Sequence, residues 1–157
     1  SRRNIDYILK NMFPMIISFD KLNQVRHIRF LKDMDGLAAH MEKHRALLEP
    51  KFRAVLAILD EGLSGCGSIA RWTKPNGGYF LSLYTLGGCA KRTVQLCREA
   101  GVVLTDAGAA YPYGVDPQDS NILIAPTFPP LDELETASRL LCVCVRIATL
   151  EKLLQRQ

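Results

Sequence analysis

Two histidines, His40 and His44, have the spacing in this sequence that comes nearest to a metal-binding pattern. They lie four residues apart in a segment predicted to be helical, so both imidazoles fall on one helix face. The zinc-protease pattern requires a glutamate directly after the first histidine, and Met41 occupies that position. Two solvated histidines explain the same spacing, and on these grounds the sequence predicts no metal site.

Two further patterns match catalytic motifs only in outline. The segment from Gly65 to Ala70 fits G-x-G-x-x-A, but it follows a helical segment and enters an extended one. Dinucleotide binding needs the opposite order, in which the glycines open a helix. Ser18 and Lys21 have the Ser-x-x-Lys spacing of acylating enzymes, but Asp20 between them is better explained as a helix N-cap. The residues alone therefore name no catalytic centre.

Any functional site must be positioned by helices and strands, and the first predicted elements of the chain are helices. Hydrophobic periodicity predicts helices over residues 2–11 and 20–32, and then a long helix from an Asp35 cap to about Leu59. Pro50 lies inside that long helix and should kink or divide it.

The rest of the chain mixes strands and helices. The predicted elements are, in order, a hairpin of strands 69–73 and 79–84, a helix 89–100 ended by Gly101, a strand 102–104, an irregular stretch 105–121, a strand 122–125, and a final helix from Pro129 to about Leu154. This order predicts an α+β fold, in which helices cover one face of a small mixed sheet and a helical arm precedes it.

Length and composition fit one folded unit. The chain has 157 residues, of which 48% are hydrophobic and 23% charged, so it can bury a core and is not expected to be disordered. No apolar run approaches the roughly 20 residues that a membrane span needs, so we expect no membrane partner.

Charge and cysteine content suggest the compartment and the partners. Residues 1–53 hold 11 Lys and Arg against 6 Asp and Glu. The basic arm at 21–32 within it has neither an aromatic stacking platform nor a clear helix-turn-helix pattern, so we expect no nucleic-acid partner. The five cysteines are odd in number and form no C-x-x-C pair, which favours a reducing cytoplasm.

One segment carries a recognisable signature. Residues 72–80 read Trp-Thr-Lys-Pro-Asn-Gly-Gly-Tyr-Phe. This resembles the W-x-x-P-x-G-G-x-F hairpin in the small domain of fold type I pyridoxal-phosphate aminotransferases. Residues 20–27 (D-K-L-N-Q-V-R-H), 111–114 (Y-P-Y-G) and 121–129 (N-I-L-I-A-P-T-F-P) are similar to further blocks of the family in the same order. Together they point to its aspartate-aminotransferase-like, MocR-type branch.

The resemblance implies a function and indicates which domain of such an enzyme this chain would be. Such enzymes move an amino group between an amino acid and a 2-oxo acid on pyridoxal phosphate, which a lysine holds as a Schiff base. None of the lysines here matches that residue, so the chain is expected to be the C-terminal small domain and not to be catalytic alone. Residues 1–34 would be a helical arm following the large cofactor-binding domain, and residues 35–157 the small domain.

The resemblance also assigns residues. The substrate side would be lined by the hairpin residues Asn76, Gly77 and Gly78, together with Tyr111, Tyr113 and Asn121. Lys21, Asn23 and Arg26 would lie near the interface of a homodimer. No residue of this chain is expected to hold the cofactor covalently.

Two departures from the family pattern affect the expected activity. Where the family has an arginine that grips the substrate carboxylate, this chain has Leu123, which cannot donate a hydrogen bond. Ser18 and Phe19 stand where the family usually has Gly-Pro. Another basic residue could substitute, the substrate could differ, or the protein could be a degenerate homologue that serves in dimerisation or regulation.

Overall fold

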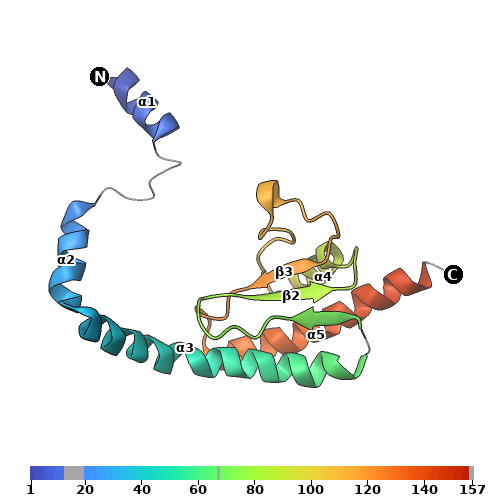
Figure 1. Ribbon diagram of the computed structural model, residues 1–157. Coiled ribbons are helices and arrows are strands. Elements are labelled where there is room, and N and C mark those ends of the chain that lie inside the picture. Colours follow the sequence, from blue (N-terminus) through green and yellow to red (C-terminus); the bar gives the residue numbers. More distant parts are fainter. Residues whose placement is uncertain (13–19, 67, 156–157) are drawn as a thin grey trace. The chain divides into compact units, whose positions relative to one another are not determined.

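The computed structural model describes residues 1–12, 20–66 and 68–155, and its contacts divide the chain into two units, Ser1–Arg45 and Ala46–Gln157. The division falls inside one helix, α3 (Met34–Leu63). Ser18 and Phe19, which depart from the family pattern, lie outside the described residues. The two units are described separately below (Figure 1).

The first unit is made of helices with little burial. It contains α1 (Arg2–Asn11), α2 (Lys21–Leu31) and the start of α3, and neither α1 nor α2 has a buried residue. Asp20 caps α2 as predicted, since its Oδ1 accepts a hydrogen bond from the Asn23 N–H at 3.0 Å. Several large apolar side chains of α1 and α2 are more than half exposed, among them Ile5, Leu9, Leu22, Ile28 and Phe30.

The structure corrects one prediction about α3 and narrows another. Asp35 is not the cap, because Oδ1 of Asp33 accepts from the Gly36 N–H at 2.8 Å, three residues ahead, which is the geometry of an N-cap. Pro50 does not divide the helix, which runs on through it to Leu63, so of the two predicted effects only a kink is left. Proline fixes φ at a helical value but removes one backbone hydrogen bond.

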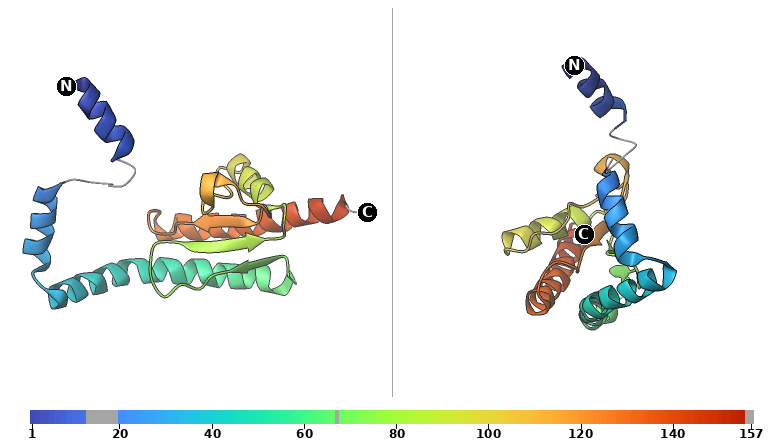
Figure 2. Two further views of the ribbon diagram at one scale, coloured as in Figure 1. Left: turned by 45° about the horizontal axis from the view of Figure 1, so that its top comes forward. Right: turned by 90° about the vertical axis from the view of Figure 1, so that its left-hand side faces the viewer.

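The second unit is an α+β domain, as predicted. Its sheet has the order β1 (Ala70–Trp72), β2 (Leu81–Thr85), β3 (Asn121–Ile124), and both pairings are antiparallel. The hairpin of β1 and β2 is confirmed, with Ala70 opposite Thr85 and Trp72 opposite Leu83. The helices α3, α4 (Ala90–Glu99) and α5 (Leu131–Leu154) pack along the sheet in Figures 1 and 2.

The expectation of a mixed sheet was wrong, because residues 102–104 form no strand. Gly101 has a φ of +91°, and the Val102 N–H donates to the Cys97 carbonyl at 2.8 Å while the Gly101 N–H donates to Arg98 at 3.1 Å. These two bonds make the Schellman motif that ends α4. The segment's backbone is thus used to close a helix instead of pairing with the sheet.

One face of the sheet is closed by the helices. Along β2, residues at every second position are buried, which is the pattern of a strand with one covered face. The core is built from these side chains and the inner faces of the helices; its members include Val55, Leu59, Leu63, Leu81, Leu83, Val94, Cys97, Ile122, Leu141 and Val145.

Cys97, Cys142 and Cys144 behave as small apolar groups in this core. None of the five cysteines is in a disulfide, and all except the half-buried Cys66 are buried. Burial raises the pKa of the Cys97 thiol to about 12, with a further rise from its hydrogen bond to Cys144. Burial likewise raises the pKa of Cys142 to about 11. Both thiols therefore stay protonated near neutral pH and are poor nucleophiles.

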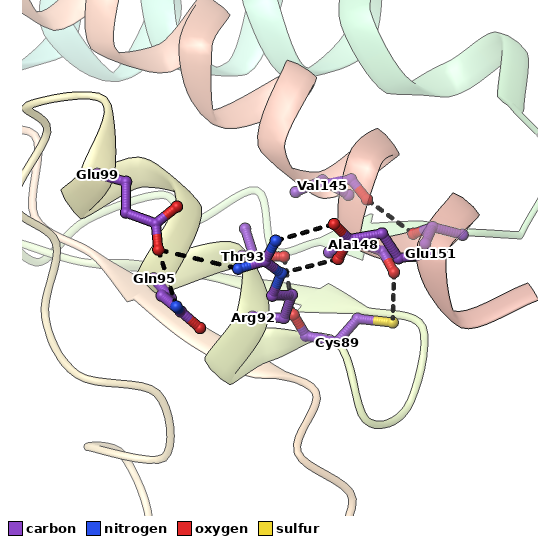
Figure 3. Close-up of polar contacts among 9 residues, drawn as sticks. Cys89, Arg92, Thr93, Gln95, Glu99, Val145, Ala148 and Glu151 are labelled. Carbon is purple, nitrogen blue, oxygen red and sulfur yellow. Dashed lines mark hydrogen bonds and ion pairs between the residues drawn. The ribbon is translucent and has the colours of Figure 1, made fainter. Parts of the chain in front are cut away.

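A polar clamp joins α4 to α5 at the edge of the core (Figure 3). The Arg92 guanidinium donates to both carboxylate oxygens of Glu151, at 2.7 and 2.8 Å. This bidentate pair raises the pKa of Arg92 and lowers the pKa of Glu151. Beside it, the buried Cys89 thiol contacts the Ala148 carbonyl at 3.7 Å. The helices are thus fixed by hydrogen bonds as well as by apolar packing.

Candidate functional site

The second face of the sheet, which we call the open face, carries the residues of interest. Cross-strand partners point to the same side of a sheet. Since Arg71 pairs with Tyr84, Tyr84 with Asn121, and Ser82 with Leu123, these five side chains share the face opposite to Leu81, Leu83 and Ile122. Of these five side chains only that of Arg71 is positively charged, and none is a lysine. The residue at the family's arginine position thus lies on the open face, across from Ser82.

Arg71 does not take over the place of the missing arginine. Its guanidinium carbon lies 4.0 Å from the centre of the Tyr84 ring, a cation–π contact. Arg71 is on β1 and Leu123 on β3, with β2 between them, so their backbones are separated by about 10 Å. The side chain is stacked on a tyrosine beside Leu123, and it forms no ion pair with a described carboxylate.

The predicted hairpin residues lie at one end of the sheet. Asn76, Gly77 and Gly78 form an exposed turn. Gly78 has a φ of +88°, which side chains rarely tolerate, whereas a Cβ added at Gly77 would meet no atom within 4 Å. Lys74, just before the turn, pairs with Asp60 of α3 at 3.1 Å and fixes the hairpin to the helical layer.

Asn121 lies at the other end of β3 and is the least satisfied polar residue of the site. It is 1% exposed, and its Oδ1 has no hydrogen-bond partner among the described residues. Its main chain is well held, because the N–H donates to Asp116 at 2.8 Å and the carbonyl accepts from Gly108 at 3.3 Å. A buried amide oxygen without a partner costs free energy, which marks the position as functional or completed by another group.

Asp116 organises this end of the sheet. Its carboxylate accepts backbone hydrogen bonds from Gln118, Ser120 and Asn121 at 2.9, 2.7 and 2.8 Å. Partial burial would raise the pKa of Asp116, but the three N–H donors outweigh it and the pKa is lowered. The ionised carboxylate therefore sets the position at which β3 begins.

The loop that carries the two predicted tyrosines closes on itself. Gly108 has a φ of +85°, and a Cβ there would lie 2.7 Å from the Gly114 carbonyl oxygen. Tyr111 is half-buried, and its N–H donates to the Gly108 carbonyl at 2.8 Å. Tyr113 is fully exposed and has a φ of +59°, unusual for a residue with a side chain. The loop presents Tyr113 to the outside at the expense of backbone strain.

The segment after β3 is fastened to α3 by a lysine. Nζ of Lys51 donates to the carbonyls of Thr127 and Pro129 at 2.8 and 2.7 Å. Between them Phe128 is 95% exposed, and Tyr79 and Phe80 of the hairpin are also more than half exposed. Exposed aromatic side chains at the hairpin end of the sheet are typical of a surface that contacts something else.

The structure thus brings together only part of the predicted set. Asn121 shares a hydrogen-bonded loop with Tyr111 and Tyr113, while Asn76 to Gly78 lie at the opposite end of the sheet. The predicted interface residues Lys21, Asn23 and Arg26 are exposed on α2 in the first unit. Among the described residues no group of three or more His, Cys, Asp or Glu could hold a metal, and no described helix is long and apolar enough to cross a membrane.

Comparison with known proteins assigns the family. The profile of the aspartate aminotransferase family matches residues 1–157. The chain belongs to the aspartate aminotransferase family. An aminotransferase of Mycolicibacterium smegmatis is 48% identical over 154 residues, which are 98% of this chain and 36% of that protein. The chain therefore spans about a third of the length of this curated relative.

Solved aminotransferases have the same fold. An aspartate transaminase of Corynebacterium glutamicum superposes with a TM-score of 0.81 at 42% identity, over 97% of this chain and 36% of that one. The α-aminoadipate aminotransferase of Thermus thermophilus, solved with N-(5′-phosphopyridoxyl)-L-leucine, superposes with a TM-score of 0.68 at 17% identity, over 95% of this chain and 37% of that one. The α+β unit is thus an aminotransferase small domain.

The open face does not by itself fit the family's cofactor. Pyridoxal phosphate needs a lysine amine for its Schiff base and donors around its phosphate. The open face has no lysine. Nζ of Lys51 already donates to two backbone carbonyls, and Lys74 forms an ion pair with Asp60. The open face alone therefore cannot hold pyridoxal phosphate as a Schiff base.

Two positioning residues, Asp116 and Lys51, were not predicted. Asp116 stands before a proline and close to a strand, a context in which Asp commonly bonds to nearby N–H groups, so a turn signal was present. Lys51 bonds to carbonyls 76 and 78 residues away, and nothing in the sequence indicates that contact.

Proposed function

We propose that this chain is the small domain of a pyridoxal-phosphate-dependent aminotransferase, which moves an amino group between an amino acid and a 2-oxo acid. In this proposal the domain covers the substrate, and the lysine that holds the cofactor belongs to another part of the protein. The observation that carries it is the match of the whole chain to the family together with an open face that offers no lysine. The chain alone is then not catalytic.

The open face and its two ends would form the substrate side. The turn Asn76–Gly78 would offer backbone groups, since Gly77 leaves room for a close approach. At the other end, the unpaired Oδ1 of Asn121 would accept a hydrogen bond from a group outside this domain, and Tyr111 and Tyr113 would lie on the same side as Asn121. The burial of Asn121, the strained backbone of Tyr113 and the open space around Gly77 support these roles.

Leu123 sets the expected limit of the activity. An aliphatic side chain cannot pair with a carboxylate, and Arg71, the one guanidinium on the open face, is stacked on Tyr84. We therefore infer that the protein handles amino acids poorly unless another part of it supplies the cation. The alternative is a degenerate homologue that acts in dimerisation or regulation, with Lys21, Asn23 and Arg26 at a homodimer interface in the cytoplasm.

A chimera distinguishes the two functions. This chain would replace the matching third of the Corynebacterium glutamicum aspartate transaminase, and turnover of aspartate would be measured with Leu123, with Leu123→Arg and with Leu123→Met. The Arg variant should raise kcat/KM by about 100-fold or more over Leu, because an arginine then pairs with a carboxylate that is otherwise unpartnered. Leu123→Met should remain slow.

The remaining outcomes separate the alternatives. Brisk turnover with Leu123 would show that position 123 does not control carboxylate binding. A chimera that binds the cofactor, forms dimers and stays inactive with Leu123→Arg would favour the dimerisation or regulatory role. The oligomeric state is measured by light scattering on the same samples.

A further inference from the structure

The first unit contains a pair of imidazoles that the aminotransferase function does not use. On α3, Nε2 of His40 lies 3.0 Å from Nε2 of His44, and the ring centres are 4.6 Å apart. Residues at i and i+4 of a helix are neighbours, so this geometry follows from one helical segment and needs no other part of the chain.

The His40–His44 pair is packed against a neighbouring ring, and no described carboxylate pairs with either imidazole. The ring of Phe30, from α2, meets the His40 ring edge-on with centres 5.2 Å apart. In the described part of the chain neither imidazole is paired with a carboxylate, and the nearby Glu42 is engaged by Arg45 at 3.4 Å. His27, the third histidine of the chain, is different, because its Nδ1 bonds to the Asn23 carbonyl at 2.8 Å.

The separation of the two nitrogens suits a metal ion. Histidine nitrogens lie about 2.0–2.1 Å from Zn²⁺, so two of them at angles of about 90–110° are about 2.9–3.4 Å apart. The observed 3.0 Å falls in this interval. In the metal-free protein the same distance allows one imidazole to donate its Nε2 proton to the other.

We propose that His40 and His44 form a two-histidine site for a borderline transition-metal dication such as Cu²⁺, Ni²⁺ or Zn²⁺. Both Nε2 atoms bind the ion in their deprotonated form, which places the ring protons on Nδ1, and water fills the remaining positions. Imidazole suits these ions and not Mg²⁺ or Ca²⁺, which prefer oxygen ligands. This inference is independent of the aminotransferase proposal, because it uses no residue of the sheet unit.

The test is a Ni²⁺ titration of the 157-residue chain by calorimetry. Cys66→Ser is the background, which removes the one cysteine that is not fully buried. One Ni²⁺ should bind per chain, and His40→Asn or His44→Asn should each weaken binding by more than about tenfold, since even losing an outer-shell group costs that much. His27→Asn is the matched control and should bind like the background, and Mg²⁺ should give no heat.

A second measurement needs no histidine variant. In ¹H–¹⁵N spectra of the imidazoles, diamagnetic Zn²⁺ should shift the signals of His40 and His44 together and leave those of His27 in place. The proposal is overturned if the chain binds no Ni²⁺, if binding survives both His40→Asn and His44→Asn, or if the His27 signals shift as far as those of the pair.

Discussion

The two faces of the sheet differ in how completely their side chains are packed and hydrogen-bonded. The closed face packs Leu81, Leu83 and Ile122 against three helices, and the Arg92–Glu151 clamp ties two of those helices together. On the open face the buried amide oxygen of Asn121 has no hydrogen-bond partner within the described part of the chain, and a fully exposed Tyr113 lies in the loop next to it. Stability is therefore concentrated on one face, and the other face is available for contacts outside this domain.

The largest expected difference between the faces comes from two leucines on neighbouring strands. Leu83 is fully buried on the closed face, so Leu83→Ala should lower the free energy of unfolding by about 2–5 kcal/mol. Leu123 is only partly buried on the open face, and Leu123→Ala should cost less, about 1 kcal/mol. Urea denaturation followed by circular dichroism measures both. Equal losses would mean that the open face is as important to the fold as the closed one.

Most of the closed face could be predicted from the sequence, because its elements have strong local signals. Period-2 and helical patterns placed β2, α4 and α5, and the glycine at 101 ended α4 as expected. The prediction of a strand at residues 102–104 was wrong. Valine is common in strands, but the N–H of Val102 is hydrogen-bonded in the cap that ends α4.

The open face was predictable only through the family resemblance. The resemblance singled out Asn121, Tyr111 and Tyr113, but it could not show that Asn121 is buried with an unpaired oxygen or that Tyr113 is strained. The bonds from Lys51 depend on how the chain returns to itself in three dimensions, which no local pattern records. The bonds to Asp116 are local, and only a general turn signal indicated them. The positions of individual hydrogen bonds therefore came only from the structure.

A glycine pair tests whether the loop at the open face is held tightly. Gly108→Ala forces a side chain onto a φ of +85° and against the Gly114 carbonyl, so it should destabilise the domain by about 1–3 kcal/mol. Gly77→Ala in the hairpin turn meets only open space and should change stability by less than about 0.5 kcal/mol. The measurement is the unfolding midpoint in urea. A neutral Gly108→Ala would show that the loop readily adopts another conformation.

A smaller effect is expected from the carboxylate that sets the start of β3. The pKa of Asp116 is lowered in the folded chain, so its stabilisation is complete above the unfolded value of about 3.9 and is lost as pH falls through the lowered folded value. Asp116→Asn should therefore be less stable than wild type at pH 6, and the gap should narrow progressively as the pH falls below about 3.9. Thermal melts from pH 2.5 to 7 measure it.

The matched control for Asp116 is Asp132→Asn in the first turn of α5, where no described group donates to the carboxylate. This variant makes the same chemical change without removing a carboxylate that backbone N–H groups bind, so its stability difference from wild type should change less over this pH range than that of Asp116→Asn. Equal changes for the two variants would show that the backbone N–H bonds are not the source of the effect.

The central claim is that this domain supplies the substrate side of an aminotransferase and not the lysine that holds the cofactor. Its most direct test is to mix the 157-residue chain with pyridoxal phosphate, reduce with borohydride, and locate modified lysines by mass spectrometry. We predict only low, scattered labelling of exposed lysines and no saturable absorption band of an internal aldimine. A stoichiometric adduct on one lysine, with a band that acid reverses, would contradict the account.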